Sequence, residues 1–114
     1  MTAIHVINVV LYFWQKIEGL DALVNLEELY LGKNKITKLE GLKNLRKLTI
    51  LSLQSNRITK LEDLDTLTEL DQLYLSHNGL ECLEGLEHNV STSPVAESAR
   101  FHAKSHSMFT LRLN

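Results

Sequence analysis

Aliphatic residues recur through the middle of the chain with a fixed period of 22 residues. Alignment on Asn34, Asn56 and Asn78 brings the surrounding leucines of three consecutive copies into register. Three copies in phase predict a repeat protein in which each copy forms one turn of a stack. The apolar positions of the first full copy are Leu26, Leu29, Leu31, Ile36, Leu39, Leu42 and Leu45.

Each copy divides into a strand and a return. Around Tyr30, Ser52 and Tyr74 the leucines alternate at period two, which predicts short strands with one buried side that line up as a parallel sheet. The remainder of a copy, such as residues 36–45, spaces its leucines by three and predicts a 3₁₀ or short helical return. The predicted fold class is an α/β solenoid, with parallel strands on the concave face and the returns on the convex face.

The aligned asparagines stand where each strand ends and the chain bends. A side-chain amide at this place can satisfy backbone groups that would otherwise be buried without a partner. We therefore expect Asn34, Asn56 and Asn78 to form a structural ladder, and the loss of one to cost about 1–3 kcal/mol. A ladder that binds a ligand is the alternative interpretation of a polar residue that recurs in register.

The pattern weakens toward the amino terminus. Ile4, Ile7 and Val9 fit the strand half of an earlier copy, but Tyr12 stands in place of the asparagine and Trp14 in place of the isoleucine. Residues 1–14 are therefore expected to be a degenerate turn or a cap, followed by the repeat array.

The period also stops near His88, so the array is expected to span residues 15–88. Residues 89–114 are rich in serine and histidine and have no period, which predicts a disordered tail. The final FTLRLN alternates, and an additional strand is the alternative there.

Composition narrows the possible partners and locations. With 114 residues, 44% of them hydrophobic, the chain can form one domain or one short array. Its 12 basic and 14 acidic residues are interspersed and give a net charge of -2, so nucleic acid is not an expected partner. The single cysteine, Cys82, favours a reducing compartment. Residues 3–14 are apolar but shorter than the roughly 20 residues of a membrane helix, so a core strand is expected there and no membrane partner.

The sequence offers no motif for catalysis, metal binding or a cofactor, so we expect neither an enzyme nor a bound cofactor. His102 and His106 would share one face of a helix, but no third metal ligand lies nearby. Cys82 has no basic neighbour that would activate it, and a half-buried core thiol is the simpler interpretation.

The inner, concave side of the strands is the remaining candidate for function. Tyr30 and Tyr74 lie there two turns apart, and tyrosine is enriched at the centres of protein interfaces. The alternative is that they only cover neighbouring leucines. The candidate partner-binding residues are Glu28, Tyr30, Ser52, Gln54, Gln72 and Tyr74.

Positions between the leucines carry a more specific resemblance. Residues 32–35 (GKNK), 54–57 (QSNR) and 76–79 (SHNG) are not dictated by the general repeat pattern LxxLxLxxNxI. With the leucines of residues 15–88, they resemble the protein phosphatase 1 regulatory subunit 7 family, which consists of leucine-rich repeat proteins with 22-residue repeats.

That resemblance implies a non-catalytic protein of nucleus and cytoplasm that binds the protein phosphatase 1 catalytic subunit through its concave face. Tyr30 falls where the family presents an aromatic side chain to the phosphatase, and Ser52 and Tyr74 occupy the equivalent inner positions of the next two turns. Both ends of the chain depart from the family pattern, which suggests a truncated or variant form. Two alternatives stay open: a general leucine-rich repeat scaffold for another intracellular protein, and a truncated product with no independent function.

Overall fold

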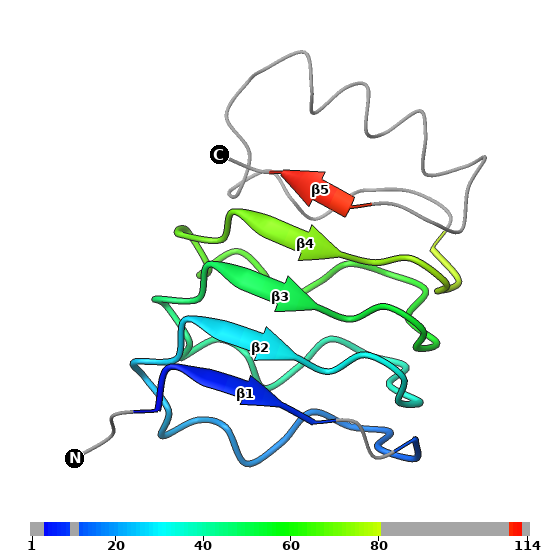
Figure 1. Cartoon of the computed structure of the whole chain (residues 1–114), viewed down its shortest axis with the longest axis horizontal. Helices are drawn as coiled ribbons and strands as arrows, with labels where there is room; N and C mark the ends of the chain where they lie inside the picture. Colours follow the sequence, from blue (N-terminus) through cyan, green and yellow to red (C-terminus); the bar gives the residue numbers. More distant parts are fainter. Residues whose placement is uncertain (1–3, 10–11, 81–109, 113–114) are drawn as a thin grey trace.

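Five short strands form a single sheet in a computed structural model that describes residues 4–9, 12–80 and 110–112. The strands follow one another in the sheet in the order of the sequence, and the first four run parallel (Figure 1). Their bounds are β1 (Val6–Asn8), β2 (Glu28–Tyr30), β3 (Ile50–Ser52), β4 (Gln72–Tyr74) and β5 (Thr110–Arg112).

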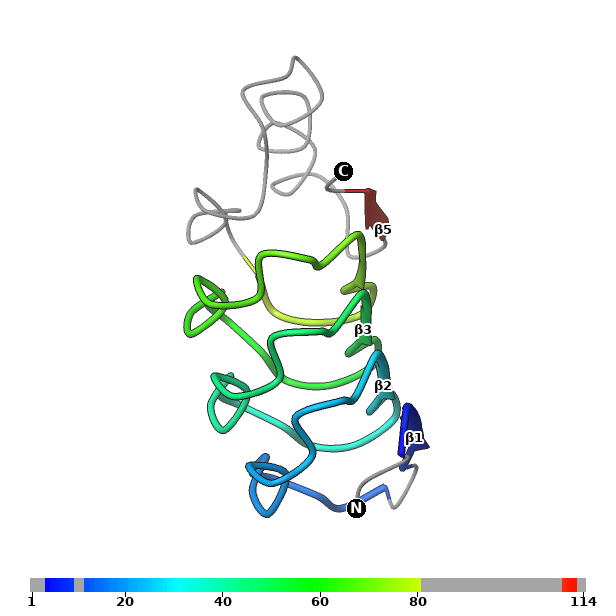
Figure 2. The ribbon, with the colours of Figure 1, turned by 90° about the vertical axis from the view of Figure 1, so that its left-hand side faces the viewer.

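The repeat period appears directly in the strand register. Leu29 pairs with Leu51, and Leu51 with Leu73, so each residue lies beside its equivalent one repeat later. All three leucines are completely buried. Seen along the sheet, the strands form one wall of the stack and the returns the opposite wall (Figure 2). The predicted solenoid with a parallel sheet is confirmed.

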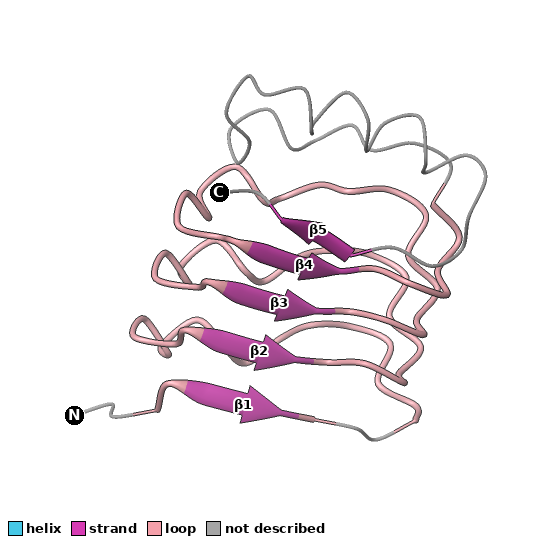
Figure 3. Cartoon of the chain, turned by 45° about the horizontal axis from the view of Figure 1, so that its top comes forward, coloured by secondary structure: helices cyan, strands magenta, loops and turns pink. Residues whose placement is uncertain are grey.

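Successive tight turns make up the returns. Leu45 donates its backbone N–H to the Leu42 carbonyl at 3.0 Å, and Leu48 donates to Leu45 at 3.1 Å. Bonds of this three-residue span are those of a 3₁₀ turn, and they place every third leucine on the same side of the chain. Within the described part of the chain, the returns are turns and loops without an assigned helix (Figure 3).

The core is a continuous column of aliphatic side chains from Ile17 to Leu75, and most of them are fully buried. Each contributes about 1.5–3 kcal/mol on full burial, but only when a neighbouring turn covers it. The irregular first turn continues this column, because Ile17 is buried and Ile7 and Trp14 pack against the core. β1 is also in register with β2, so the departures at Tyr12 and Trp14 do not interrupt the stack.

A left-handed residue precedes each repeat asparagine. Lys33, Ser55 and His77 all have φ of 58°, a conformation that costs a non-glycine residue about 1–2 kcal/mol. The neighbouring turns hold two of them in place, since the Lys33 N–H donates to Gln54 at 2.9 Å and the Ser55 N–H donates to Ser76 at 2.8 Å. Next to the asparagines, Lys33, Arg57 and His77 are exposed.

A second left-handed position recurs in the returns at Gly19, Gly41 and Asp63, with φ of 80°, 74° and 60°. At Gly41 there is also no space for a side chain, because a Cβ atom would lie 2.7 Å from the backbone oxygen of Ile17. Asp63 occupies the same conformation without the freedom of glycine.

β5 lies in the segment for which the sequence predicts a tail. Thr110–Arg112 pairs antiparallel with β4, so the backbone edge of β4 is covered by a strand from the end of the chain. At these three residues the strand considered as the alternative is the one observed. Residues 81–109, with the end of the predicted array and most of the predicted tail, lie outside the described residues.

Candidate protein-binding face

The side of the sheet opposite the core is the one that the sequence analysis calls the inner, concave side, and it is called the outer face from here on. It is formed by the residues on either side of the buried strand leucines. Because side chains alternate along a strand, Glu28 and Tyr30 point away from Leu29 and onto this face. The strand register then aligns two rows across the sheet. One row is Val6, Glu28, Ile50 and Gln72, and the other is Asn8, Tyr30, Ser52 and Tyr74.

Tyr30 is held in place by its own strand. Its hydroxyl donates a hydrogen bond of 2.7 Å to Oε1 of Glu28, two residues earlier on the same face. This bond to the Glu28 carboxylate raises the pKa of Tyr30 above its usual value of 10.0, and partial burial and the charges of Glu28 and Tyr74 act in the same direction. The Tyr30 hydroxyl therefore stays protonated at neutral pH and remains a hydrogen-bond donor.

Tyr74 repeats this arrangement two strands away. Its hydroxyl donates to Oε1 of Gln72 at 2.6 Å, again two residues earlier. Ser52 lies between the two tyrosines in the register and is only 7% exposed, while Ile50 is half-buried between Glu28 and Gln72. The structure therefore brings five of the six predicted partner-binding residues together on one continuous face.

Gln54, the sixth predicted residue, lies just beyond β3 and is exposed. Its side chain extends over Gly32 of the preceding turn, where an added Cβ atom would lie 3.1 Å from Cγ of Gln54. Gly32 thus provides the space in which Gln54 lies flat at the border of the outer face.

Sequence reasoning left three residues of this face out of the candidate set, namely Val6, Asn8 and Ile50. Val6 and Asn8 of β1 are exposed and pair with Glu28 and Tyr30. The period of 22 residues contains the signal, because it aligns each of them with its partner in β2.

The asparagines form a hydrogen-bonded ladder beside the sheet. The Asn56 amide donates to the carbonyls of Leu53 in its own turn and Leu31 in the preceding turn, at 2.9 and 3.0 Å. Its oxygen accepts the Ile36 backbone N–H at 3.0 Å. Asn78 repeats the set one turn later, and the Asn34 amide donates to Leu31 and to Val9 of the first turn. These side chains link successive turns, as expected for the structural ladder described in the sequence analysis.

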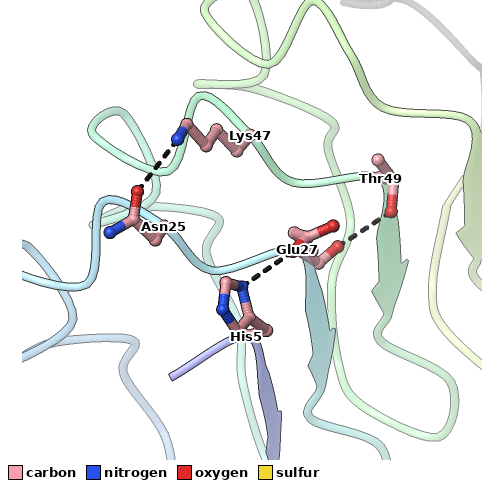
Figure 4. Close-up of polar contacts among 5 residues, drawn as sticks. All are labelled: His5, Asn25, Glu27, Lys47 and Thr49. Carbon is pink, nitrogen blue, oxygen red and sulfur yellow. Dashed lines mark hydrogen bonds and ion pairs between the residues drawn. The ribbon is translucent and has the colours of Figure 1, made fainter. Parts of the chain in front are cut away.

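Polar side chains also link the turns where the chain enters the strands (Figure 4). His5 forms an ion pair with Glu27 at 2.7 Å, and the Thr49 hydroxyl donates to the Glu27 carbonyl at 3.0 Å. Lys47 donates to the side-chain oxygen of Asn25, also at 3.0 Å. At this edge several polar side chains therefore already have partners within the protein.

Residues 4–9, 12–80 and 110–112 contain no group of three or more His, Cys, Asp or Glu side chains arranged to hold a metal ion. These residues also include no helix of the length and apolarity needed to cross a bilayer. Cys82, His102 and His106 lie outside them.

Comparison with solved structures finds similar folds among bacterial internalins of Listeria monocytogenes. InlF aligns with a TM-score of 0.70 and 36% identity over 75% of this chain and 25% of its own. InlJ gives 0.62 and 24% over 75% and 23% of the two chains, and internalin C2 gives 0.51 and 29% over 75% and 47%. The chain thus spans about a quarter of the length of the first two internalins.

A search among curated proteins returned no significant match. The sequence does match the model of the leucine-rich repeat family over residues 24–80, which include β2 to β4 and all three aligned asparagines. Solenoids of this architecture offer extended surfaces for binding other proteins. Repeat period, parallel register and family match agree, and the chain belongs to the leucine-rich repeat family.

Proposed function

We propose that this chain is a non-catalytic module that binds a protein through the outer face, and that its partner is the catalytic subunit of protein phosphatase 1. The observation that carries the first part is the pair of tyrosines, Tyr30 and Tyr74, fixed two strands apart on one face. The partner is suggested by the resemblance of residues 32–35, 54–57 and 76–79 to the phosphatase regulatory subunit family.

The outer face has the properties of an interface centre before any partner arrives. Tyrosine combines a large apolar ring with a polar hydroxyl, and few torsion angles have to be fixed on binding. The bonds from Tyr30 to Glu28 and from Tyr74 to Gln72 already restrict the two rings. Such preorganisation lowers the entropic cost of association. Ile50 lies between the two polar acceptors in the register and adds a half-buried apolar contact.

A pull-down with purified phosphatase catalytic subunit tests both parts of the proposal. Binding should be retained by the unmodified chain and weakened by Tyr30→Ala and by Tyr74→Ala. Truncation of an interface hot spot costs about 2 kcal/mol or more, which corresponds to roughly a thirtyfold weaker affinity. Phe13→Ala is the matched control, because Phe13 is an aromatic residue with 65% exposure that does not belong to the strands of the outer face.

The outcomes separate the two parts. Equal weakening by Phe13→Ala and the tyrosine variants would refute the role of the outer face. If a folded chain, verified by a cooperative melt, fails to retain the catalytic subunit, the phosphatase is not its partner. Binding of a different protein that still depends on Tyr30 and Tyr74 would support a general scaffold. A nuclear and cytoplasmic location is the remaining part of the proposal, and it rests on the same resemblance.

A further inference from the structure

A hollow with basic walls lies at the opposite edge of the stack from the contacts in Figure 4, where the chain leaves the strands. It has a volume of about 390 Å³ and is open to solvent. Its lining comes from the residues on either side of the repeat asparagines, together with the exposed ring of Tyr12. The lining residues are Tyr12, Lys33, Asn34, Lys35, Ser55, Asn56, Arg57 and His77.

The floor and the rim of this hollow have different roles. Asn34 and Asn56 form its floor, and their amides are bonded to backbone carbonyls. The rim carries Lys33, Lys35 and Arg57, of which Lys33 and Arg57 are exposed and Lys35 is half-buried. The exposed side chains of Lys33 and Arg57 can contact a ligand from solvent.

Charge is segregated at this edge. Residues 32–38 contain three lysines and residues 54–60 contain one arginine and one lysine, and neither segment has an acidic residue. The segments that enter the strands mix both signs, as in Glu27 and Lys47. In the part of the chain that the structure describes, no Asp or Glu lines the hollow, although the chain as a whole has a net charge of -2.

Among the described residues, the cations of the rim have no ion-pair partner. Within the described residues, the ion pairs are His5 with Glu27 and Lys43 with Asp63, and neither involves the hollow. Lys35 and Arg57 are equivalent residues of adjacent turns. The Arg57 N–H donates to the carbonyl of Ile36, the residue after Lys35, at 2.8 Å. Like charges in adjacent turns repel one another, and an anionic ligand would reduce that repulsion.

We propose that this hollow binds an acidic segment of a partner protein, through contacts of its carboxylates with Lys33, Lys35 and Arg57. The cations are spread over adjacent turns, which lie about 4.8 Å apart, rather than converging on one point. Spread charges suit an extended peptide with several carboxylates better than one small ion. The exposed ring of Tyr12 adds apolar contact area beside them. This inference does not depend on the protein that the outer face binds.

Fluorescence anisotropy with a labelled peptide of about twelve residues, alternating Glu and Ser, tests the proposal on the full chain. A peptide with Gln in place of Glu is the ligand control. The double variant Lys35→Gln/Arg57→Gln should bind the Glu peptide about tenfold more weakly. Arg46→Gln/Lys47→Gln removes the same charge from exposed residues at the other edge and should change affinity less than about threefold.

The binding should also weaken as salt rises, and Tyr30→Ala/Tyr74→Ala should leave it intact. Equal losses in the two charge variants would show attraction to net charge alone and overturn the proposal. Absence of binding by a chain that melts cooperatively would also overturn it. Tighter binding of an oligouridylate through Lys35 and Arg57 would assign the hollow to nucleic acid instead. Loss of peptide binding in the tyrosine variant would place the peptide on the outer face.

Discussion

The replacement Asn56→Ala tests how the turns are held together, because the consequences for each bonded group can be followed in the structure. Three carbonyls lose a donor, but each keeps another one: Leu31 retains Asn34, Leu53 retains Asn78, and Gln54 retains the Lys33 N–H. The Ile36 N–H is different. It donates to Oδ1 of Asn56 at 3.0 Å, in a buried position.

The expected loss of stability follows from this distinction. An unpaired buried N–H costs about 1–3 kcal/mol, and the weakened carbonyl bonds add about 1 kcal/mol in total. We therefore expect Asn56→Ala to lower the free energy of unfolding by about 2–4 kcal/mol. Asn78 is itself only half-buried, so water can take the place of its side chain beside the Ile58 N–H, and Asn78→Ala should cost about 1 kcal/mol.

Urea unfolding followed by circular dichroism gives both free energies, provided the slope against denaturant is unchanged. Hydrogen exchange adds a local readout, because the Ile36 amide should exchange faster in Asn56→Ala than in the unmodified chain. Asn56→Asp is a further control, since a carboxylate accepts from Ile36 but cannot donate to the carbonyls. It should destabilise more than alanine at neutral pH. Unchanged Ile36 exchange, or a smaller cost at Asn56 than at Asn78, would refute this account of the ladder.

Three further predictions concern the returns and the outer face. Gly41→Ala should cost at least about 2 kcal/mol in urea unfolding, because of its φ of 74° and the approach of Cβ to the Ile17 oxygen. Asp63→Gly should instead raise the free energy of unfolding by about 0.5–1 kcal/mol, because relief of the left-handed strain exceeds the entropy that glycine adds to the unfolded chain. A lower free energy of unfolding would contradict this prediction. Ultraviolet titration should show Tyr30 ionising above the usual range, and Glu28→Gln should lower that pKa. Because the folded pKa is the higher one, stability contributed by Tyr30 is present below pH about 10 and is lost as pH rises further, a loss that Tyr30→Phe should reduce.

The regular part of the fold could be predicted because its signal is periodic. The positions of Leu29, Leu51 and Leu73 follow from the repeat, and alternation then places Tyr30 and Tyr74 on the opposite side. The alternation of side chains along a strand does not determine their torsion angles. The bonds from the tyrosine hydroxyls to residues 28 and 72 depend on torsion angles that many sequences of the same pattern would not share.

The left-handed bends at Lys33, Ser55 and His77 could not be predicted for a different reason. Glycine and asparagine are the usual signals of positive φ, and none of these residues is either. At Lys33 and Ser55 the conformation is held from outside the segment, by hydrogen bonds that cross between turns. Lys35 and Arg57 lie one repeat apart in the sequence, and in the structure they line one hollow.

The asparagine ladder gives the stack a direction. The side-chain oxygens of Asn56 and Asn78 each accept a backbone N–H of the turn before, from Ile36 and from Ile58. Deletion of a later turn therefore leaves a buried donor unpaired in the turn that remains. Deletion of the first turn takes the Val9 acceptor from Asn34, which still donates to Leu31, and it also takes the Trp14 carbonyl from the Lys35 N–H. The asparagine oxygen, however, always comes from the later turn, so the polar groups of a turn are all paired only when its successor has folded onto it.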